Sequence, residues 1–273
     1  MRFKKVAIVG LGLIGGSIAK AIKKYHLASS LWGLAHTSLS LNKIKKLSLF
    51  DRLTLNLEEA VRGAELVILA VPTLAIREYI VKLSGKLSDK SLVIDVGSVK
   101  KPIVKAGSKF LKSKFVGTHP LSGSEKKGIN EARADLFKNS LVIIVPSRHK
   151  TSTQKAALFW RSLGAKVKFV GAEKHDKIMA FTSHLPHLIA FSLLESLPEN
   201  FLKYKAGSLR DITRVAASSA LLWYDIFSDN FANIKLAFDR FVKSSRQIMG
   251  YVKAADKQRF LKLVERANRK ALR

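Results

Sequence analysis

The sequence predicts an α/β protein, in which a doubly wound parallel sheet is followed by an all-helical domain. Short apolar runs alternate with helical patterns through the first half of the chain, as in βαβ units. Three of these runs are apolar without interruption, which is typical of parallel strands covered on both faces. After Gly171 no strong strand signal follows, and long helical patterns take over. We therefore predict two domains, residues 1–171 and 172–273.

The first predicted strand, Lys5–Val9, follows a basic start and leads directly into a glycine-rich turn. No small-residue cleavage site stands out there, so we interpret the segment as a buried strand and not as a secretory signal. Further strands are predicted at Ser30–Ala35, Glu65–Val71, Ser91–Val96, Leu141–Val145 and Lys166–Val170. The helical patterns between them cover Ser17–Tyr25, Ser40–Leu47 and Thr151–Leu163.

The second domain is predicted to hold four long helices. Their patterns cover His175–Leu197, Leu221–Asn230, Phe231–Gly250 and Lys253–Arg273. Residues 178–194 contain no Asp, Glu, Lys or Arg, but they include two histidines and a proline. Such a segment fits a buried functional helix better than a lipid-spanning one. We therefore expect no membrane association and a cytoplasmic protein.

Charge is the most unusual feature of the composition. The chain has 49 Lys and Arg against 20 Asp and Glu, a formal net charge of +29. This excess indicates an anionic partner, which could be nucleic acid, a membrane surface or a small anionic substrate. The 47% hydrophobic fraction excludes global disorder. The absence of cysteine excludes disulfides, thiolate metal sites and cysteine nucleophiles.

The glycine-rich turn has the spacing G-x-G-x-x-G between a strand and a helix, the fingerprint of a Rossmann-type dinucleotide-binding domain. Gly10 is expected to form the tight turn, Gly12 to let the backbone approach a pyrophosphate, and Gly15 to allow close helix–strand packing. The phosphates would lie at the helix N-terminus, where N–H groups favour anions. The predicted cofactor contacts here are Gly10, Gly12, Leu13, Ile14 and Gly15, joined by Val71 and Pro72 after a later strand.

The residues after the second predicted strand bear on the choice of cofactor. NAD-selective sites usually carry Asp or Glu there, whereas this chain has Ala35-His36-Thr37-Ser38. Residues 1–50 contain nine Lys or Arg and no acid. We predict that NADP is preferred over NAD, with His36, Thr37 and Ser38 near the 2′-phosphate. The alternative is that Ala35 is merely neutral and both cofactors are used.

Three further segments gather polar residues, and together they carry a family resemblance. They are Asp95-Val96-Gly97-Ser98-Val99-Lys100, the stretch 117–125 (GTHPLSGSE), and Ser183-His184-Leu185-Pro186-His187 with the later stretch 207–214 (GSLRDITR). With the glycine turn, in this order, the sequence resembles the prephenate/arogenate dehydrogenases of tyrosine biosynthesis. The resemblance covers nearly the whole chain.

The resemblance implies an oxidative decarboxylation of a cyclohexadienol that carries a ring carboxylate. Hydride passes from the hydroxyl-bearing ring carbon to the nicotinamide, CO2 is lost and the ring becomes aromatic. The products would be 4-hydroxyphenylpyruvate from prephenate or tyrosine from arogenate. The resemblance also implies a homodimer formed through the helical domain.

The resemblance further implies roles for individual residues. His119 corresponds to the catalytic histidine, which accepts a hydrogen bond from the hydroxyl, and Ser98 helps to place it. Arg214 corresponds to the arginine that binds substrate carboxylate as a fork. Asp211 lies three residues earlier on the same helical face and is expected to orient Arg214. The remaining predicted substrate contacts are Arg210, Gly207, His187, Ser124, Glu125 and Trp223, the last of which could reach the partner's active site.

Several alternatives accompany this interpretation. Trp223 could belong to ordinary core packing. A metal site built from His184, His187 and Glu125 is conceivable by spacing, but we predict none because hydride transfer needs no metal. The chain could be another oxidoreductase with a Rossmann and a helical domain. A basic nucleic-acid-associated protein is less favoured, since no recognised nucleic-acid motif is present, and we expect no specific nucleic-acid partner.

Overall fold

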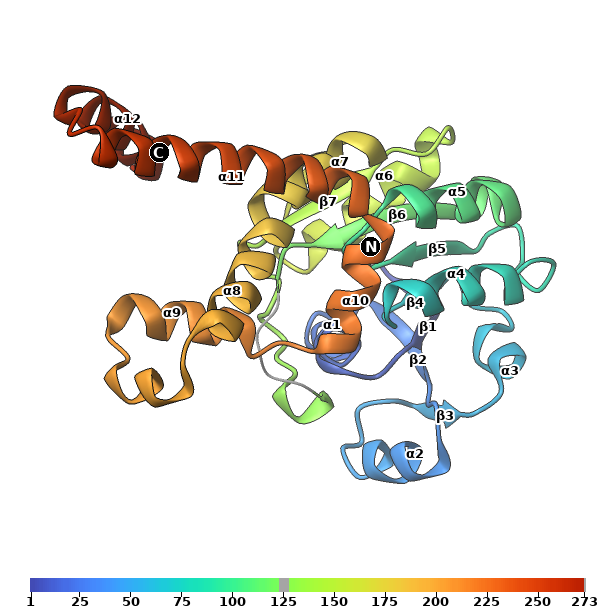
Figure 1. Ribbon diagram of the computed structural model, residues 1–273. Coiled ribbons are helices and arrows are strands. Elements are labelled where there is room, and N and C mark those ends of the chain that lie inside the picture. The colour runs from blue at the N-terminus through green and yellow to red at the C-terminus, as the bar shows by residue number, and fades with distance from the viewer. Residues whose placement is uncertain (123–127, 273) are drawn as a thin grey trace.

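The sheet of the first part contains eight strands in the order β3-β2-β1-β4-β5-β6-β7-β8 in the computed structural model, which describes residues 1–122 and 128–272. The strands are β1 (Phe3–Val9), β2 (Ala28–Leu34), β3 (Arg52–Thr54), β4 (Leu66–Leu69), β5 (Leu92–Asp95), β6 (Phe115–Pro120), β7 (Leu141–Val145) and β8 (Lys166–Phe169). Helices cover both faces of the sheet (Figure 1). The predicted α/β fold class with a following helical domain is confirmed.

Each face of the sheet has its own hydrophobic layer. The helices of this part are α1 (Leu13–Lys24), α2 (Ser38–Lys45), α3 (Leu57–Val61), α4 (Thr73–Lys82), α5 (Lys101–Phe110) and α6 (Lys150–Ser162). In β1, Val6 and Ile8 pack with α1 and α6, whereas Ala7 and Val9 pack with α3, α4 and α5. Successive strand residues point to opposite faces, which explains why the run is apolar without interruption.

The sheet is mostly parallel, as predicted, and departs from that arrangement at one pair of strands. β6 and β7 are antiparallel, with Gly117 opposite Val145 and Thr118 opposite Ile144. Because β8 is parallel to β7, both strands run against the other six. Both faces of β7 are still covered, so its apolar pattern is the same in either direction.

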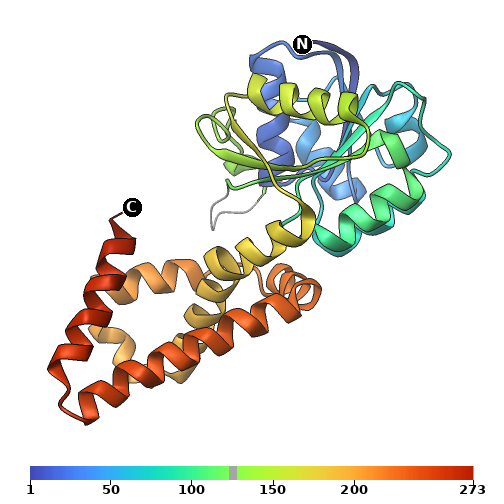
Figure 2. The same cartoon turned by 90° about the horizontal axis from the view of Figure 1, so that it is seen from above.

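The second part is helical from Ala172 onward in the described residues. It contains α7 (Ala172–Met179), a π-helical turn (Ala180–His184), α8 (Leu185–Ser196), α9 (Gly207–Ala216), α10 (Ala220–Asp229), α11 (Phe231–Lys253) and α12 (Lys257–Ala271). Figure 2 shows α11 leading away from the sheet and α12 turning back from the far end of α11. The two parts meet where Val99, which follows β5, packs with Trp223 and Ile226 of α10.

The described helices include none that is both long and apolar enough to cross a membrane. The segment 178–194 is divided among α7, the π-helical turn and α8, and it packs against α11 through Ala180 and Leu185.

Candidate active site

A cavity of about 590 Å³ lies between the carboxyl ends of β5 and β6 and the helical part. It brings together five of the predicted site residues, which are Ser98, His119, His187, Arg214 and Trp223. Its other lining residues are Pro120, Leu121, Ser122, Met179, Thr182, Ser183, His184, Val215, Ser218, Leu222 and Ile226. Ligands of open α/β sheets bind at this edge, so the position matches that of a substrate site.

A buried ion pair holds the two strand ends that carry Ser98 and His119. The side chains of Asp95 and Lys100 are both 0% exposed and form a salt bridge. Lys100 Nζ also donates to the Thr118 carbonyl at 2.8 Å, while Asp95 accepts from the main-chain N–H of Thr118 at 3.0 Å. The pair therefore links β5 to β6 directly beneath the cavity. Burial lowers the pKa of Lys100, and the neighbouring Asp95 opposes that shift.

His119 is the first member of a buried chain of side chains. Its Nδ1 lies 2.9 Å from Nε2 of His175, whose Nδ1 lies 2.7 Å from Oδ1 of Asp176. Burial lowers the pKa of His119 well below 6.5, and the neighbouring Lys100 ammonium acts in the same direction. A neutral imidazole at the cavity wall can accept a proton from a bound ligand.

His175 and Asp176 are functional residues to which no sequence motif assigned a role. Both are buried, on α7, and Asp176 also accepts from the main-chain N–H groups of Lys100 at 2.7 Å and Lys101 at 2.8 Å. Their signal in the sequence was a histidine and an aspartate in adjacent positions at the start of a predicted helix. Only the fold places them beside His119, 56 residues earlier in the chain.

His187 and Trp223 form an aromatic wall of the cavity. Their rings are stacked, with centroids 3.8 Å apart and planes inclined by 25°. His187 Nδ1 donates to the Ser183 carbonyl at 2.9 Å, and burial lowers the pKa of its imidazole. Trp223 is 7% exposed and lines the cavity of its own chain.

The π-helical turn positions His184 beside this wall, with its ring edge-on to Trp223. Such turns are frequent at functional sites because they shift side chains relative to the regular helix. Asn230 donates to His184 Nδ1 at 3.0 Å and to the main-chain carbonyl of Asp176 at 2.8 Å. Burial lowers the pKa of His184 to about 4. These bonds hold the neutral His184 in the lining of the cavity.

The predicted residues of α9 separate into two groups. All of them are exposed, but only Arg214 lines the cavity, whereas Gly207, Arg210 and Asp211 lie outside its lining. Within the described part of the chain no ion pair joins Arg214 to Asp211. Ser124 and Glu125 lie outside the described residues, so the conceivable metal site with His184 and His187 has no described third ligand.

Ser122 is an additional polar group at the cavity that the sequence-based reasoning left out. Its hydroxyl is buried and has no hydrogen-bond partner among the described residues. It lies in the cavity lining close to His119 in the chain. A buried hydroxyl without a partner carries an energetic penalty that a polar ligand could relieve.

The glycine turn has the shape that a dinucleotide needs. Gly10 has φ +94°, and a Cβ there would lie 2.4 Å from the Ala70 carbonyl oxygen. A Cβ on Gly15 would lie 2.0 Å from the Gly10 carbonyl oxygen, so both positions require glycine. Gly12 is exposed with open space around it, and it precedes α1 without a side-chain cap. The N–H groups at the start of α1 are therefore accessible to a phosphate.

The other predicted cofactor contacts lie at the same edge of the sheet. Leu13 and Ile14 form the first turn of α1, and Val71 and Pro72 follow β4, with Val71 against the Gly10 turn. His36, Thr37 and Ser38 follow β2 and are exposed at the start of α2. The Thr37 hydroxyl accepts from the N–H of Ser40 at 3.2 Å and caps α2.

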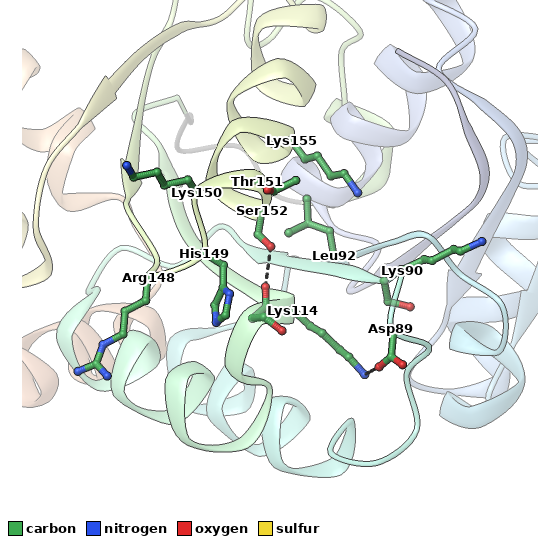
Figure 3. Close-up of a pocket in the computed structure, with 12 residues that line it drawn as sticks. Asp89, Lys90, Leu92, Lys114, Arg148, His149, Lys150, Thr151, Ser152 and Lys155 are labelled. Carbon is green, nitrogen blue, oxygen red and sulfur yellow. Dashed lines mark hydrogen bonds and ion pairs between the residues drawn. The ribbon is translucent and has the colours of Figure 1, made fainter.

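A separate hollow of about 410 Å³ lies near the amino end of β5 (Figure 3). Its lining is rich in basic side chains, among them Lys90, Lys114, Arg148 and His149. Lys114 pairs with Asp89 at 3.1 Å, and Lys90 and Lys150 point away from one another. The hollow contains none of the predicted site residues.

Comparison with known proteins identifies the family of this arrangement. Residues 18–169 match the domain described as "Prephenate dehydrogenase, nucleotide-binding domain", and residues 171–266 match "Prephenate dehydrogenase, dimerization domain". The chain is 33% identical to the cyclohexadienyl dehydrogenase of Zymomonas mobilis, covering 93% of this chain and 90% of that protein. It is 34% identical to the prephenate dehydrogenase of Bacillus subtilis, covering 96% and 74% respectively.

A solved structure agrees with the sequence matches. Prephenate dehydrogenase from Aquifex aeolicus, in complex with hydroxyphenyl propionate and NAD+, superposes with a TM-score of 0.94 at 30% identity. The similarity covers 100% of this chain and 98% of that one. The fold, the position of the cavity and these matches lead to one conclusion: the chain belongs to the prephenate dehydrogenase family.

Proposed function

We propose that the protein catalyses the oxidative decarboxylation of prephenate or arogenate with a nicotinamide cofactor, in the biosynthesis of tyrosine. The observation that carries this proposal is the pairing of a neutral histidine and an arginine in one cavity. The histidine suits a substrate hydroxyl, and the arginine suits a substrate carboxylate. Cofactor phosphates would bind at Gly12 and the start of α1, at the same edge of the sheet.

His119 is the group that accepts and returns a proton in this scheme. The bound nicotinamide supplies the acceptor for the hydride that leaves the hydroxyl-bearing ring carbon. His119 takes the hydroxyl proton as that carbon becomes a carbonyl. When the bond to the ring carboxylate breaks, its electron pair enters the ring, CO2 leaves and His119 returns the proton to the new phenolic oxygen. Protons and charge then balance over the cycle.

Ser98 and Arg214 orient the substrate for this transfer. Ser98 lies within the turn held by Asp95 and Lys100, so its hydroxyl is placed on the same rigid edge as His119. Arg214 offers a planar guanidinium that can bind a carboxylate with two parallel hydrogen bonds. The stacked rings of His187 and Trp223 provide an apolar, planar surface for a six-membered ring.

NADP is the proposed preferred cofactor. The stretch that follows β2 has no acid to repel a 2′-phosphate, and His36 and Ser38 are exposed there. The first turn of α2 also lacks acidic residues. A comparison of kcat/KM with NADP and NAD tests this preference, and a hundredfold preference for NAD would refute it.

A homodimer through the helical part is also proposed. Large apolar side chains are exposed on α10 and α11, including Leu221 at 70%, Phe231 at 65% and Met249 at 67%. An apolar surface of this kind favours a protein partner. The match of this region to a dimerization domain supports a second copy of the chain as that partner. Sedimentation equilibrium of the purified protein measures the mass directly.

The central experiment combines both substrates with both cofactors. Purified protein is mixed with prephenate or arogenate and with NADP or NAD, and reduced cofactor, CO2 and the aromatic product are measured together. We expect equal amounts of all three from at least one combination. A well-folded protein that reduces neither cofactor with either substrate would overturn the proposal.

A further inference from the structure

We propose that His175, anchored by Asp176, fixes the tautomer of His119 so that Nε2 of His119 is the proton-accepting nitrogen. This makes His175 a positioning residue, and its importance for turnover rests on the function proposed above. The hydrogen bonds of Asp176 determine the direction of every other bond in this chain of side chains.

Asp176 can only accept hydrogen bonds when it is ionised. Its two oxygens already accept from the main-chain N–H groups of Lys100 and Lys101, at 2.7 and 2.8 Å. These amides lie at the start of α5, where the helix dipole favours a negative charge. The carboxylate is 2% exposed and is fixed in position. Its 2.7 Å contact with His175 Nδ1 therefore places a hydrogen on that nitrogen.

The hydrogen on Nδ1 of His175 in turn sets the direction of its bond to His119. A neutral imidazole carries one N–H, so His175 with its hydrogen on Nδ1 has a lone pair on Nε2. Nε2 of His175 then accepts from Nδ1 of His119 across 2.9 Å. The Nε2 of His119 is left with a lone pair for a ligand in the cavity. The opposite tautomer would present an N–H there and could not accept the hydroxyl proton.

Burial favours the neutral form of both rings. His175 is 0% exposed and His119 is 9% exposed. Desolvation is the largest influence on each ring and lowers its pKa. At His175 the hydrogen bond to Asp176 opposes this shift, while the buried Lys100 ammonium acts in the same direction as desolvation on both rings. Asp176 also stabilises the positive charge that His119 acquires when it takes a proton, since Nδ1–H of His119 continues to donate to His175.

Two substitutions of His175 separate this role from simple packing. In His175→Gln, the amide can donate to Asp176 while its carbonyl oxygen accepts from His119 Nδ1, so the order of hydrogen bonds can be kept. In His175→Leu, an apolar side chain fills the space and leaves His119 without an acceptor. We expect His175→Leu to lower kcat at least about a hundredfold, the usual contribution of a general base, with little change in KM. His175→Gln should remain within about tenfold of wild type.

A matched control uses His149, which lies in the separate basic hollow. His149→Leu should leave kcat unchanged. Thermal unfolding of each variant shows whether it is folded. If His175→Leu does not fold, the spectroscopic measurement on wild-type protein decides the question. A His175→Leu variant with wild-type kcat, or a Gln variant as impaired as the Leu variant, would overturn the proposal.

The spectroscopic measurement is 15N NMR of histidine-labelled protein near neutral pH, with the His119 signals assigned by their loss in His119→Asn. We expect Nδ1 of His119 to be protonated and Nε2 to be unprotonated. The reverse pattern refutes the tautomer assignment. This measurement needs no substrate, so a protein that turns over neither substrate but shows the expected pattern would refute only the proposed function.

Discussion

Replacing Lys100 with methionine should destabilise the protein by about 3–5 kcal/mol, because Asp95 would remain buried without its cation. Both side chains are 0% exposed, so water cannot substitute for the lost contact. The Thr118 carbonyl also loses the Nζ donor that lies 2.8 Å away. Asp95 keeps two main-chain donors, Gly97 N at 2.9 Å and Thr118 N at 3.0 Å. These bonds place the expected loss near the lower end of the range, about 3 kcal/mol.

Urea and thermal unfolding, followed by circular dichroism, measure this loss. For a chain of this size, about 3 kcal/mol corresponds to a fall in Tm of about 6–12 °C. Lys101→Met is the matched control, since its side chain is 64% exposed and its ion pair with Glu173 is long and solvated; its change should stay within about 0.5 kcal/mol. The double variant Asp95→Asn/Lys100→Met should lose less free energy of unfolding than the sum of the losses in the two single variants. A Lys100→Met variant that loses less than about 1 kcal/mol would refute this account of the pair.

Four further outcomes follow from the site. His119→Asn should lower kcat by about 10²–10⁴ with little change in substrate binding, as steady-state kinetics will show; wild-type turnover would remove His119 from its role. Arg214→Gln should raise KM by about 10–100-fold through loss of a charge-assisted hydrogen bond, and an unchanged KM for both substrates would contradict this. Ala35→Asp should shift the kcat/KM ratio toward NAD at least about tenfold, because an acid repels the 2′-phosphate; an unchanged ratio would count against the proposed site. The free energy of unfolding should fall as pH drops from 6.5 to about 4, because buried His184 takes up its proton more readily when unfolded; urea titrations at several pH values will show a flat profile if this is wrong.

Local sequence patterns predicted most of the strands of the fold. The predicted strand Leu141–Val145 has the bounds observed for β7, and the other predicted strands overlap β1, β2, β4, β5 and β8. β3 has three residues, too few for a pattern to emerge. β6 was hidden because its residues 117–120 combine Gly, Thr, His and Pro, which do not form an apolar run. The direction of β7 depends on pairing with a strand elsewhere in the chain, which no local pattern reports.

The candidate site was predicted unevenly for a similar reason. His119, Ser98 and Arg214 lie in distinctive motifs, and the structure brings them into one cavity. In the sequence, Lys100 cannot be distinguished from the other basic residues of a chain that has 49 of them. Only the fold shows that it is fully buried. His175 belongs to the site through its contact with His119, which lies 56 residues earlier in the chain. Most of the remaining positive charge is not explained by the site.

The place of His175 and Asp176 in the fold limits how the two parts of related proteins can be combined. Both residues belong to α7, the first helix after the sheet, whereas His119 belongs to β6 within it. Asp176 is tied to the start of α5 by two hydrogen bonds. A nucleotide-binding unit cut away at Gly171 would retain the histidine but lose the groups that orient it. Exchange of the helical part between relatives would therefore yield a working enzyme only if the incoming segment brought its own histidine and aspartate in the same register.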